Sequence, residues 1–176
     1  MTRRPPSADA PQLRPAGPAD VPVLVDLARR IWRIHYPGIL SPAQIDYMLD
    51  WMYDPARLIG ELARGVCYDF VQIAGAPVGF AGYETSVEEM KLHKLYMHPD
   101  HQRRGLGSLL LRHVEGQARQ AGCPQLLLTV NKANLNAIAA YHKHGFSIRE
   151  DIVTDIGRGF VMDDFVMTKP LNAQEA

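Results

Sequence analysis

The sequence LYMHPDHQRRGLGSLL, residues 95–110, joins a strand-like run to a glycine-rich turn and the beginning of a helical pattern. The strand stops at Pro99, two arginines follow, and Gly105 and Gly107 stand where the helix begins. The N–H groups in the first turn of a helix have no partners within the helix and lie at the positive end of its dipole, so they bind phosphate oxygens. The stretch therefore predicts a backbone cradle for a pyrophosphate.

The residue types in this turn fit such a cradle. Glycine at Gly105 and Gly107 permits backbone angles, or a close ligand approach, that a side chain would prevent. Arg103 and Arg104 can add charge-assisted hydrogen bonds to phosphate. A glycine pair is also typical of a simple turn and cap, and adjacent arginines are typical of a solvated surface. The sequence has no GxxxxGK[ST] motif and no GxGxxG directly after a buried parallel strand, which disfavours nucleotide hydrolysis and dinucleotide redox chemistry.

Length and composition favour one domain with a local anion site. The 176 residues, of which 47% are hydrophobic, suffice for one core. Nineteen basic residues balance nineteen acidic ones, so we expect neither a nucleic-acid nor a membrane partner. No signal peptide and no apolar run of about eighteen residues occurs, and we expect a cytoplasmic protein. Cys67 and Cys123 lack metal-type spacing, which predicts no metal site and favours reduced thiols, although a disulfide is compatible with the sequence.

Hydrophobic periodicity predicts an α/β protein with a mixed, mostly antiparallel central sheet and helices on both faces. Ser41, Pro42 and Gln44 predict a capping box at the second helix. In chain order the expected elements are a strand at 12–15, a helix at 20–36, a helix from 41, one or two helical turns within 54–65, two strands around a turn at 74–77, a strand at 88–97, a helix from 107, a strand at 125–130, a helix at 134–143 and strands at 146–151 and 160–168. The domain is expected at 12–170, with a disordered tail at 1–11 and a C-terminal tail at 171–176.

Two motifs resemble those of the GNAT superfamily of acyl-CoA-dependent N-acyltransferases. Residues 102–107, QRRGLG, match its Gln/Arg-x-x-Gly-x-Gly/Ala signature and stand between a strand and a helix, as that family requires. Residues 134–146, NLNAIAAYHKHGF, resemble its Asn-x-x-Ala-x-x-x-Tyr segment followed by Gly-Phe. Two motifs at the expected separation are more specific than either alone. The resemblance covers residues 13–168 and implies the GNAT fold, acetyl-CoA as cosubstrate and acetyl transfer to a primary amine.

The resemblance also implies which residues hold the cosubstrate. The bulged strand ending in Leu95, Tyr96 and Met97 should pair its backbone with the pantetheine arm and hold the thioester carbonyl near an N–H. Asn134 should contact the pantetheine or adenine side, and Lys143 the 3′-phosphate, although Asn134 is also placed to be a helix N-cap. The pyrophosphate-binding amides are expected at Arg103, Arg104, Gly105, Leu106, Gly107 and Ser108.

The catalytic candidates follow from the chemistry of acyl transfer. An alkyl amine of pKa ~10.4 is mostly protonated at neutral pH, so it needs a base or a deprotonating environment. His93, on the strand that leads into the cofactor loop, is the first candidate base, and Glu84, at the end of the preceding strand, is the second. Each is equally compatible with a structural role. Tyr141 matches the family position of the general acid that protonates the coenzyme A thiolate, and the alternative is an aromatic packing residue.

The acceptor amine is less well defined. Aromatic residues in the first third and two acidic residues near the end suit a polyamine or another small cationic amine. Aromatic residues at helical spacing are also typical of a core, and paired aspartates of a solvated turn. A protein or peptide N-acetyltransferase and a non-catalytic acyl-CoA sensor remain alternatives, and a homodimer is compatible with the family. The residues concerned are Trp32, His35, Tyr36, Trp51, Tyr53, Asp163 and Asp164.

Overall fold

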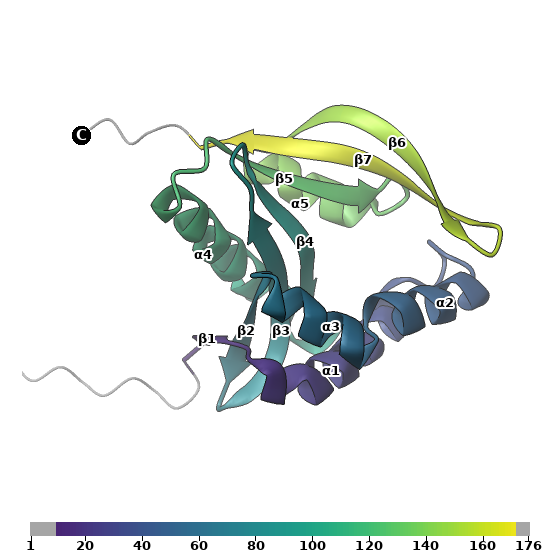
Figure 1. The fold of residues 1–176 in the computed structure, drawn as a ribbon, viewed down its shortest axis with the longest axis horizontal. Helices are drawn as coiled ribbons and strands as arrows, with labels where there is room; N and C mark the ends of the chain where they lie inside the picture. Colours follow the sequence, from purple (N-terminus) through teal and green to yellow (C-terminus); the bar gives the residue numbers. More distant parts are fainter. Residues whose placement is uncertain (1–9, 172–176) are drawn as a thin grey trace, which may run out of the picture.

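The structure, a computed structural model, describes residues 10–171. The tails predicted at 1–11 and 171–176 lie outside the described residues, apart from positions 10, 11 and 171. No helix in the described part of the chain is long and apolar enough to span a bilayer. The elements are β1 (Gln12–Pro15), the short 3-10 helix η1 (Pro18–Asp20), α1 (Val21–His35), α2 (Pro42–Met52), α3 (Pro55–Ala63), β2 (Cys67–Ile73), β3 (Ala76–Thr85), β4 (Met90–Met97), the 3-10 helix η2 (Pro99–His101), α4 (Leu106–Gln120), β5 (Gln125–Asn131), α5 (Leu135–Lys143), β6 (Ser147–Gly157) and β7 (Phe160–Pro170) (Figure 1).

Within residues 10–171, seven strands form one sheet in the order β1-β2-β3-β4-β5-β7-β6. Each neighbouring pair in this described sheet is antiparallel except β4 and β5, which run parallel. A parallel pair needs a crossover connection, and α4 lies in the segment that joins these two strands. The sheet is therefore mixed and mostly antiparallel, which confirms the fold class predicted from the sequence.

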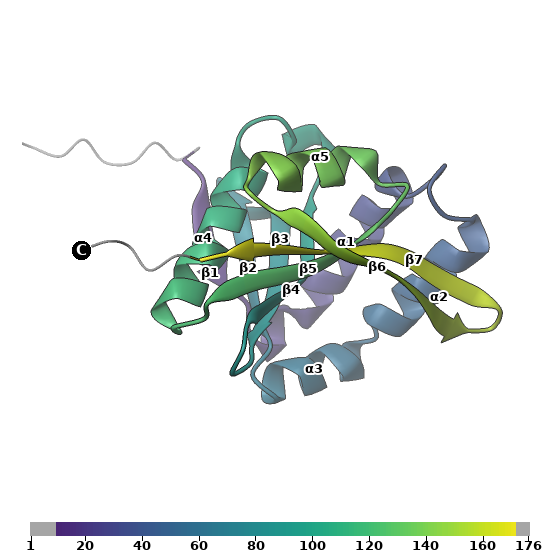
Figure 2. The ribbon, with the colours of Figure 1, turned by 90° about the horizontal axis from the view of Figure 1, so that it is seen from above.

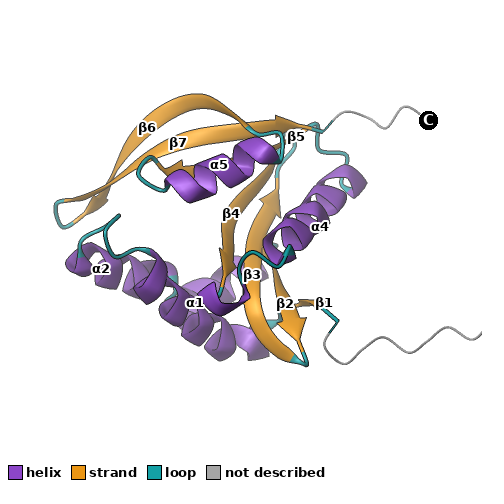
Figure 3. Cartoon of the chain, turned by 180° about the vertical axis from the view of Figure 1, so that it is seen from behind, coloured by secondary structure: helices purple, strands orange, loops and turns teal. Residues whose placement is uncertain are grey.

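The sheet is split between β4 and β5. Among the described residues, these strands pair at three positions, the last of which is Leu92 opposite Leu128. Beyond that point the register against β3 shifts, so that β4 carries one extra residue, His93. A β-bulge bends its strand and increases the local twist. In Figure 3 the two strands are close at one end and separate toward the other.

Helices cover both faces of this sheet, as predicted. Figure 2 shows α4 and α5 on one side and α1, α2 and α3 on the other. Leu95 and Met97 of β4 pack in the core under α4 and α5, whereas Tyr96 between them packs in the core under the first three helices. Because successive side chains of a strand point to opposite faces, β4 contributes to both cores and borders the split on both sides.

Two local features differ from the expectations. The segment after Asp54 forms the nine-residue helix α3, longer than one or two turns, because its apolar face, including the fully buried Leu58, packs into the core. At α2, the Ser41 hydroxyl accepts a hydrogen bond from the Gln44 N–H at 3.2 Å, as predicted. The Gln44 side chain, however, donates to the carbonyl of Val161 at 2.7 Å. The reciprocal half of the predicted capping box is therefore wrong, and Gln44 instead links α2 to β7.

Candidate active site

A cavity of about 430 Å³ passes through the sheet at the split between β4 and β5. Its wall includes Trp32 from α1 and Tyr36 at the C-cap of α1, on one face of the sheet, and Ser108 and Tyr141 from α4 and α5, on the other. Small-molecule sites typically have volumes of roughly 300–1,000 Å³. One space therefore connects the predicted cosubstrate site with the region predicted for the acceptor.

The turn before α4 has the backbone shape expected of a phosphate cradle. Gly105 is the N-cap of α4 and has a left-handed φ of 77°, which glycine adopts without a steric penalty. Arg103 is also left-handed, with φ of 59°, a conformation that costs a residue with a side chain roughly 1–2 kcal/mol. A Cβ atom added at Gly107 would meet no atom within 4 Å. The first turn of α4 therefore has open space in front of it, and the residues present fit a diphosphate group.

Most of the residues predicted for the cosubstrate lie in the wall of this cavity. They are Leu95, Tyr96, Met97, Arg103, Gly105, Gly107, Ser108 and Asn134. Leu106 is instead buried in the core beneath α4, and Arg104 and Lys143 are exposed outside the cavity wall. The contacts of these three side chains with a cosubstrate remain predictions, although the backbone N–H of Leu106 still belongs to the first turn of α4.

The edge of β4 that faces the cavity has no neighbouring strand to pair with over its C-terminal part. Beyond Leu92, β4 no longer pairs with β5, while its other edge pairs with β3 as far as Met97. Backbone N–H and C=O groups away from water require hydrogen-bond partners. The amides of a pantetheine arm provide such partners, which supports the predicted pairing of this arm with the backbone at Leu95, Tyr96 and Met97.

Two histidines with weak support from the sequence lie beside predicted cosubstrate residues. Nε2 of His144 lies 2.9 Å from the Ser108 hydroxyl, and Nε2 of His35 lies 3.1 Å from Nδ2 of Asn134. Asn134 also caps α5 by accepting a hydrogen bond from the Ala137 N–H, so it is both an N-cap and a cavity residue. Burial lowers the pKa of both histidines. No local pattern marks these pairs, because their members are 36 and 99 positions apart.

Tyr141 lines the same cavity. The residue lies on α5, and its ring contacts that of Phe146 with centroids 5.6 Å apart. Among the described residues, the Tyr141 hydroxyl makes no hydrogen bond, and this atom keeps some exposed surface. Burial raises the pKa of Tyr141 above its ordinary value. The phenol therefore keeps its proton at neutral pH and can donate it.

The two candidate bases from the sequence form a single pair. Nε2 of His93 lies 2.7 Å from Oε1 of Glu84. The β-bulge places His93 at the cavity wall, opposite the end of β3 that carries Glu84. Burial lowers the pKa of His93, and the neighbouring carboxylate opposes this change. A neutral imidazole that donates through Nε2 has its lone pair on Nδ1, so the pair can accept a proton at Nδ1.

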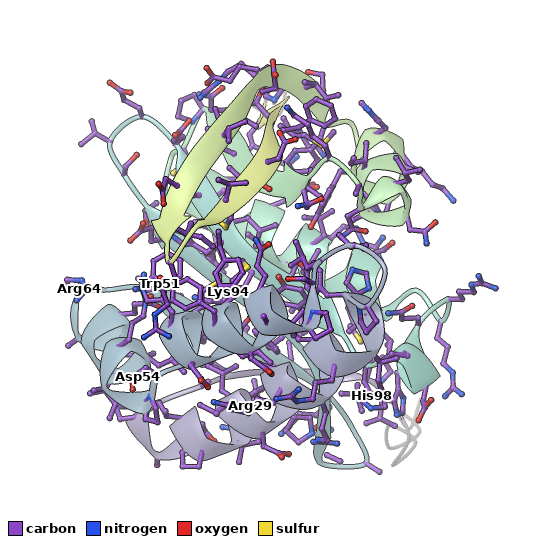
Figure 4. The ribbon with its side chains drawn as sticks, turned by 90° about the vertical axis from the view of Figure 1, so that its right-hand side faces the viewer. Arg29, Trp51, Asp54, Arg64, Lys94 and His98 are labelled. Atoms are coloured by element: carbon purple, nitrogen blue, oxygen red, sulfur yellow. The ribbon has the colours of Figure 1, made fainter. Side chains whose placement is uncertain are left out.

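A second cavity of about 320 Å³ adjoins the first. Its wall contains Glu84, His93 and the half-exposed Trp51. Figure 4 shows Trp51 and Lys94 where the yellow-green β6–β7 hairpin approaches the blue helices α2 and α3. The His93–Glu84 pair is therefore reached from between this hairpin and these helices. The residues shared by both cavities are Met52, His93, Lys94, Thr129 and Met162.

A buried lysine supports the wall between the cavities. Lys94 has 5% of its surface exposed, and its Nζ lies 2.6 Å from the Tyr68 hydroxyl and 3.2 Å from Oε2 of Glu61. Burial lowers the pKa of Lys94, while Glu61 opposes this change. Since a buried charge is tolerated only with such partners, this network holds the lysine in place, and the sequence alone did not single it out.

The residues predicted for the acceptor region take different positions. Tyr53 is fully buried and lies outside both cavity walls, so it is a core residue. Asp163 lies 2.6 Å from the Lys132 ammonium, outside the cavities. The Tyr36 hydroxyl lies 3.0 Å from that of Tyr96, and both residues line the first cavity. The predicted acceptor residues that line the first cavity are Trp32, His35, Tyr36 and Asp164.

Comparisons with known proteins agree with this geometry. The model of the acetyltransferase (GNAT) family matches residues 24–146, more than half of the chain. The chain belongs to the GNAT family. Among its GNAT-type relatives, the spermidine N(1)-acetyltransferase of Thermoplasma acidophilum is 26% identical over 157 residues, which cover 86% of this chain and 95% of that protein. The ribosomal protein bS18-alanine N-acetyltransferase of Escherichia coli is 36% identical over 73 residues, 42% of this chain and 49% of that protein.

Solved structures show the same GNAT architecture. The crystal structure of PaiA N-acetyltransferase from Thermoplasma acidophilum in complex with coenzyme A has a TM-score of 0.80 at 23% identity, covering 92% of this chain and 99% of that one. This likeness shows the fold. Family membership confirms the resemblance seen at residues 102–107 and 134–146, and with it the predicted N-acetyltransferase that uses acetyl-CoA.

Proposed function

We propose that this GNAT protein acetylates the primary amine of a small cationic molecule, such as a polyamine, by direct attack on acetyl-CoA in a ternary complex. The observation that supports this most strongly is the single cavity through the sheet. It gives a cosubstrate on the α4–α5 side and an amine on the α1–α2 side access to the same point. Use of acetyl-CoA supports the cytoplasmic location expected from the sequence.

The chain holds the cosubstrate through backbone groups. The first turn of α4, from Gly105 to Ser108, directs free N–H groups at the diphosphate, where the helix dipole favours negative charge. The free edge of β4 near Leu95 orders the pantetheine arm and places an N–H near the thioester oxygen, on which negative charge develops as the amine attacks. The cosubstrate supplies the activated acetyl group, and these residues orient it.

The His93–Glu84 pair removes the proton from the amine. The acceptor arrives as an ammonium ion and must lose one proton before its nitrogen can form a bond to the acetyl carbon. Nδ1 of His93 accepts this proton, directly or through one water, while Glu84 holds Nε2 and stabilises the imidazolium that results. This arrangement assigns one role to each of the two predicted bases.

Tyr141 completes the transfer. As the new C–N bond forms and the C–S bond breaks, the departing sulfur gains a negative charge. The protonated Tyr141 phenol in the cavity wall donates its proton to this sulfur. The nitrogen still carries two hydrogens when the C–N bond forms, and it releases the second as a proton through water to the Tyr141 phenolate, which becomes a neutral phenol again. A proton donor and a proton acceptor in one cavity support catalysis over the alternative of a non-catalytic acyl-CoA sensor.

A small acceptor is favoured over a protein or peptide. The spermidine acetyltransferase matches most of this chain, whereas the ribosomal-protein acetyltransferase matches less than half. The aromatic wall formed by Trp32, Tyr36 and Tyr96 suits an alkylammonium ion, which aromatic faces attract. The second cavity provides about 320 Å³ for the rest of the molecule.

An acceptor panel tests this proposal. The purified protein is incubated with acetyl-CoA and spermidine, spermine, a short diamine or a peptide with a free N-terminal alanine. Thiol release is followed in solution, and products are identified by mass spectrometry. We expect kcat/KM for at least one polyamine to exceed that for the peptide by about tenfold or more. Faster acetylation of the peptide would refute the small-molecule assignment, and no turnover with any amine would refute the enzymatic one.

A further inference from the structure

Asp164 is a largely buried carboxylate that has no partner among the described residues and whose oxygens keep some exposed surface in the cavity wall. It lies on β7 opposite Asn131 of β5, and 6% of its surface is exposed. Within residues 10–171, no hydrogen bond or ion pair is recorded for its side chain. Its neighbour Asp163 points to the other face of the sheet and lies 2.6 Å from the Lys132 ammonium. Two adjacent aspartates therefore have opposite environments, one paired near the surface and the other alone in the cavity wall.

An unpaired buried carboxylate is costly for the ligand-free protein. Transfer of a charged group out of water is strongly unfavourable unless partners replace the lost solvation. Burial raises the pKa of Asp164 to about 6, so the group is mostly ionised at neutral pH. Buried polar groups without partners in native proteins call for an explanation, and one explanation is a missing ligand.

The surroundings of Asp164 favour a cationic ligand. It is the sole carboxylate among the described residues that line the first cavity. Burial raises the pKa of Tyr36, which faces Asp164 from α1, to about 12, so this phenol stays neutral. The other charges that act on Asp164 are Lys132, which is paired with Asp163, and Asp163 itself, from the other face of the sheet. His35, whose pKa burial lowers, lines the same cavity. No cation of the described chain thus neutralises Asp164 by contact.

We propose that the Asp164 carboxylate binds the ammonium group of the acceptor and selects acceptors that carry a positive charge at the reacting nitrogen. This inference rests on the proposed function and names the residue that recognises the amine. The aromatic rings of Tyr36 and Trp32, with centroids 4.3 Å apart, lie in the same wall and add attraction for a cation. A carboxylate next to the amine, as in a free α-amino acid, would be repelled by Asp164 and rejected.

Calorimetric titration tests this binding without any turnover. Propylamine and spermidine are titrated into the protein saturated with coenzyme A, which carries no acetyl group. Asp164→Asn, which retains the shape of the side chain and removes its charge, should weaken binding of both amines by about 10- to 100-fold. The matched control, Asp163→Asn, removes the adjacent charge outside the cavity and should bind both amines within about twofold of the parent protein.

The pH dependence of the parent protein gives a second readout that needs no variant. Amine binding should weaken as the pH falls through about 6, where Asp164 becomes protonated, while the amines stay fully charged. The inference is overturned if the parent binds neither amine, if Asp164→Asn binds within about threefold of the parent, or if Asp163→Asn is weakened as much as Asp164→Asn. The two proposals can fail separately. If the amines bind through Asp164 but the protein acetylates none of them, the proposed reaction is refuted and the inference about Asp164 is supported.

Discussion

Replacing Asp164 with asparagine should stabilise the ligand-free protein at about pH 8 and change its stability little at about pH 4. Burial raises the pKa of the carboxyl from 3.8 to about 6, a difference that corresponds to about 3 kcal/mol of unfolding free energy. Because the folded state binds this proton more tightly than the unfolded chain, the folded protein loses stability as the pH rises from about 4 to about 6, and the whole penalty is present above that range. The amide of asparagine does not ionise and avoids the penalty.

Urea denaturation of the parent and of Asp164→Asn at a series of pH values measures this effect. At about pH 8 the variant should gain up to about 3 kcal/mol, or roughly 6–12 °C in melting temperature for a domain of this size. Asp163→Asn is the control, and because it removes only an exposed ion pair, it should lose no more than about 1 kcal/mol. Equal stability of the parent and Asp164→Asn at about pH 8, or a gain of the same size at both pH values, would refute the argument that the buried charge is uncompensated.

Three further predictions concern catalysis and cosubstrate binding. Tyr141→Phe should keep its fold and its affinity for acetyl-CoA but lose about 100-fold in kcat, with a smaller loss for an acetyl thioester of a more acidic thiol. Steady-state kinetics with acetyl-CoA and with that second thioester measures both losses, and an unchanged kcat would contradict the role of Tyr141 as general acid. His93→Ala should lower kcat by about 100-fold or more and remove the acid limb of the pH–rate profile, which lies below pH 6.5 because burial lowers the pKa of His93. Glu84→Gln should reduce kcat less than His93→Ala does and should keep the acid limb of the pH–rate profile at a shifted pH. A pH–rate profile that is unchanged in both variants would argue against the His93–Glu84 pair as the base. Gly107→Val, at a position where an added Cβ atom meets no atom within 4 Å in the ligand-free protein, should fold yet lose most of the thermal stabilisation by acetyl-CoA, about 2.7 kcal/mol at 100 times the dissociation constant. A full shift in this variant would place the cradle elsewhere.

Local patterns in the sequence were enough to predict the backbone features proposed for the cosubstrate half of the site. The left-handed turn at Gly105 and the cap at Asn134 depend on residues close to one another in the chain. The bulge in β4 also leaves a local trace. The apolar residues at 90, 92, 95 and 97 change phase between 92 and 95, and all four side chains pack in the same core. A strand without a bulge would keep a period of two throughout.

The tertiary structure alone decided the arrangement of the residues proposed for the acceptor half. From the sequence, Asp163 and Asp164 could be read only as one acidic pair. Their separation into a surface ion pair and a buried carboxylate without a protein partner depends on which face of β7 lines the cavity. The contact between His93 and Glu84 depends on the register of β3 and β4 across the β-bulge. Backbone conformation and capping follow from neighbouring residues, so the sequence alone determined the turn that we propose as the cradle. Burial and charge pairing follow from contacts between residues far apart in the chain, and those contacts exist only once the sheet and both helical layers have assembled.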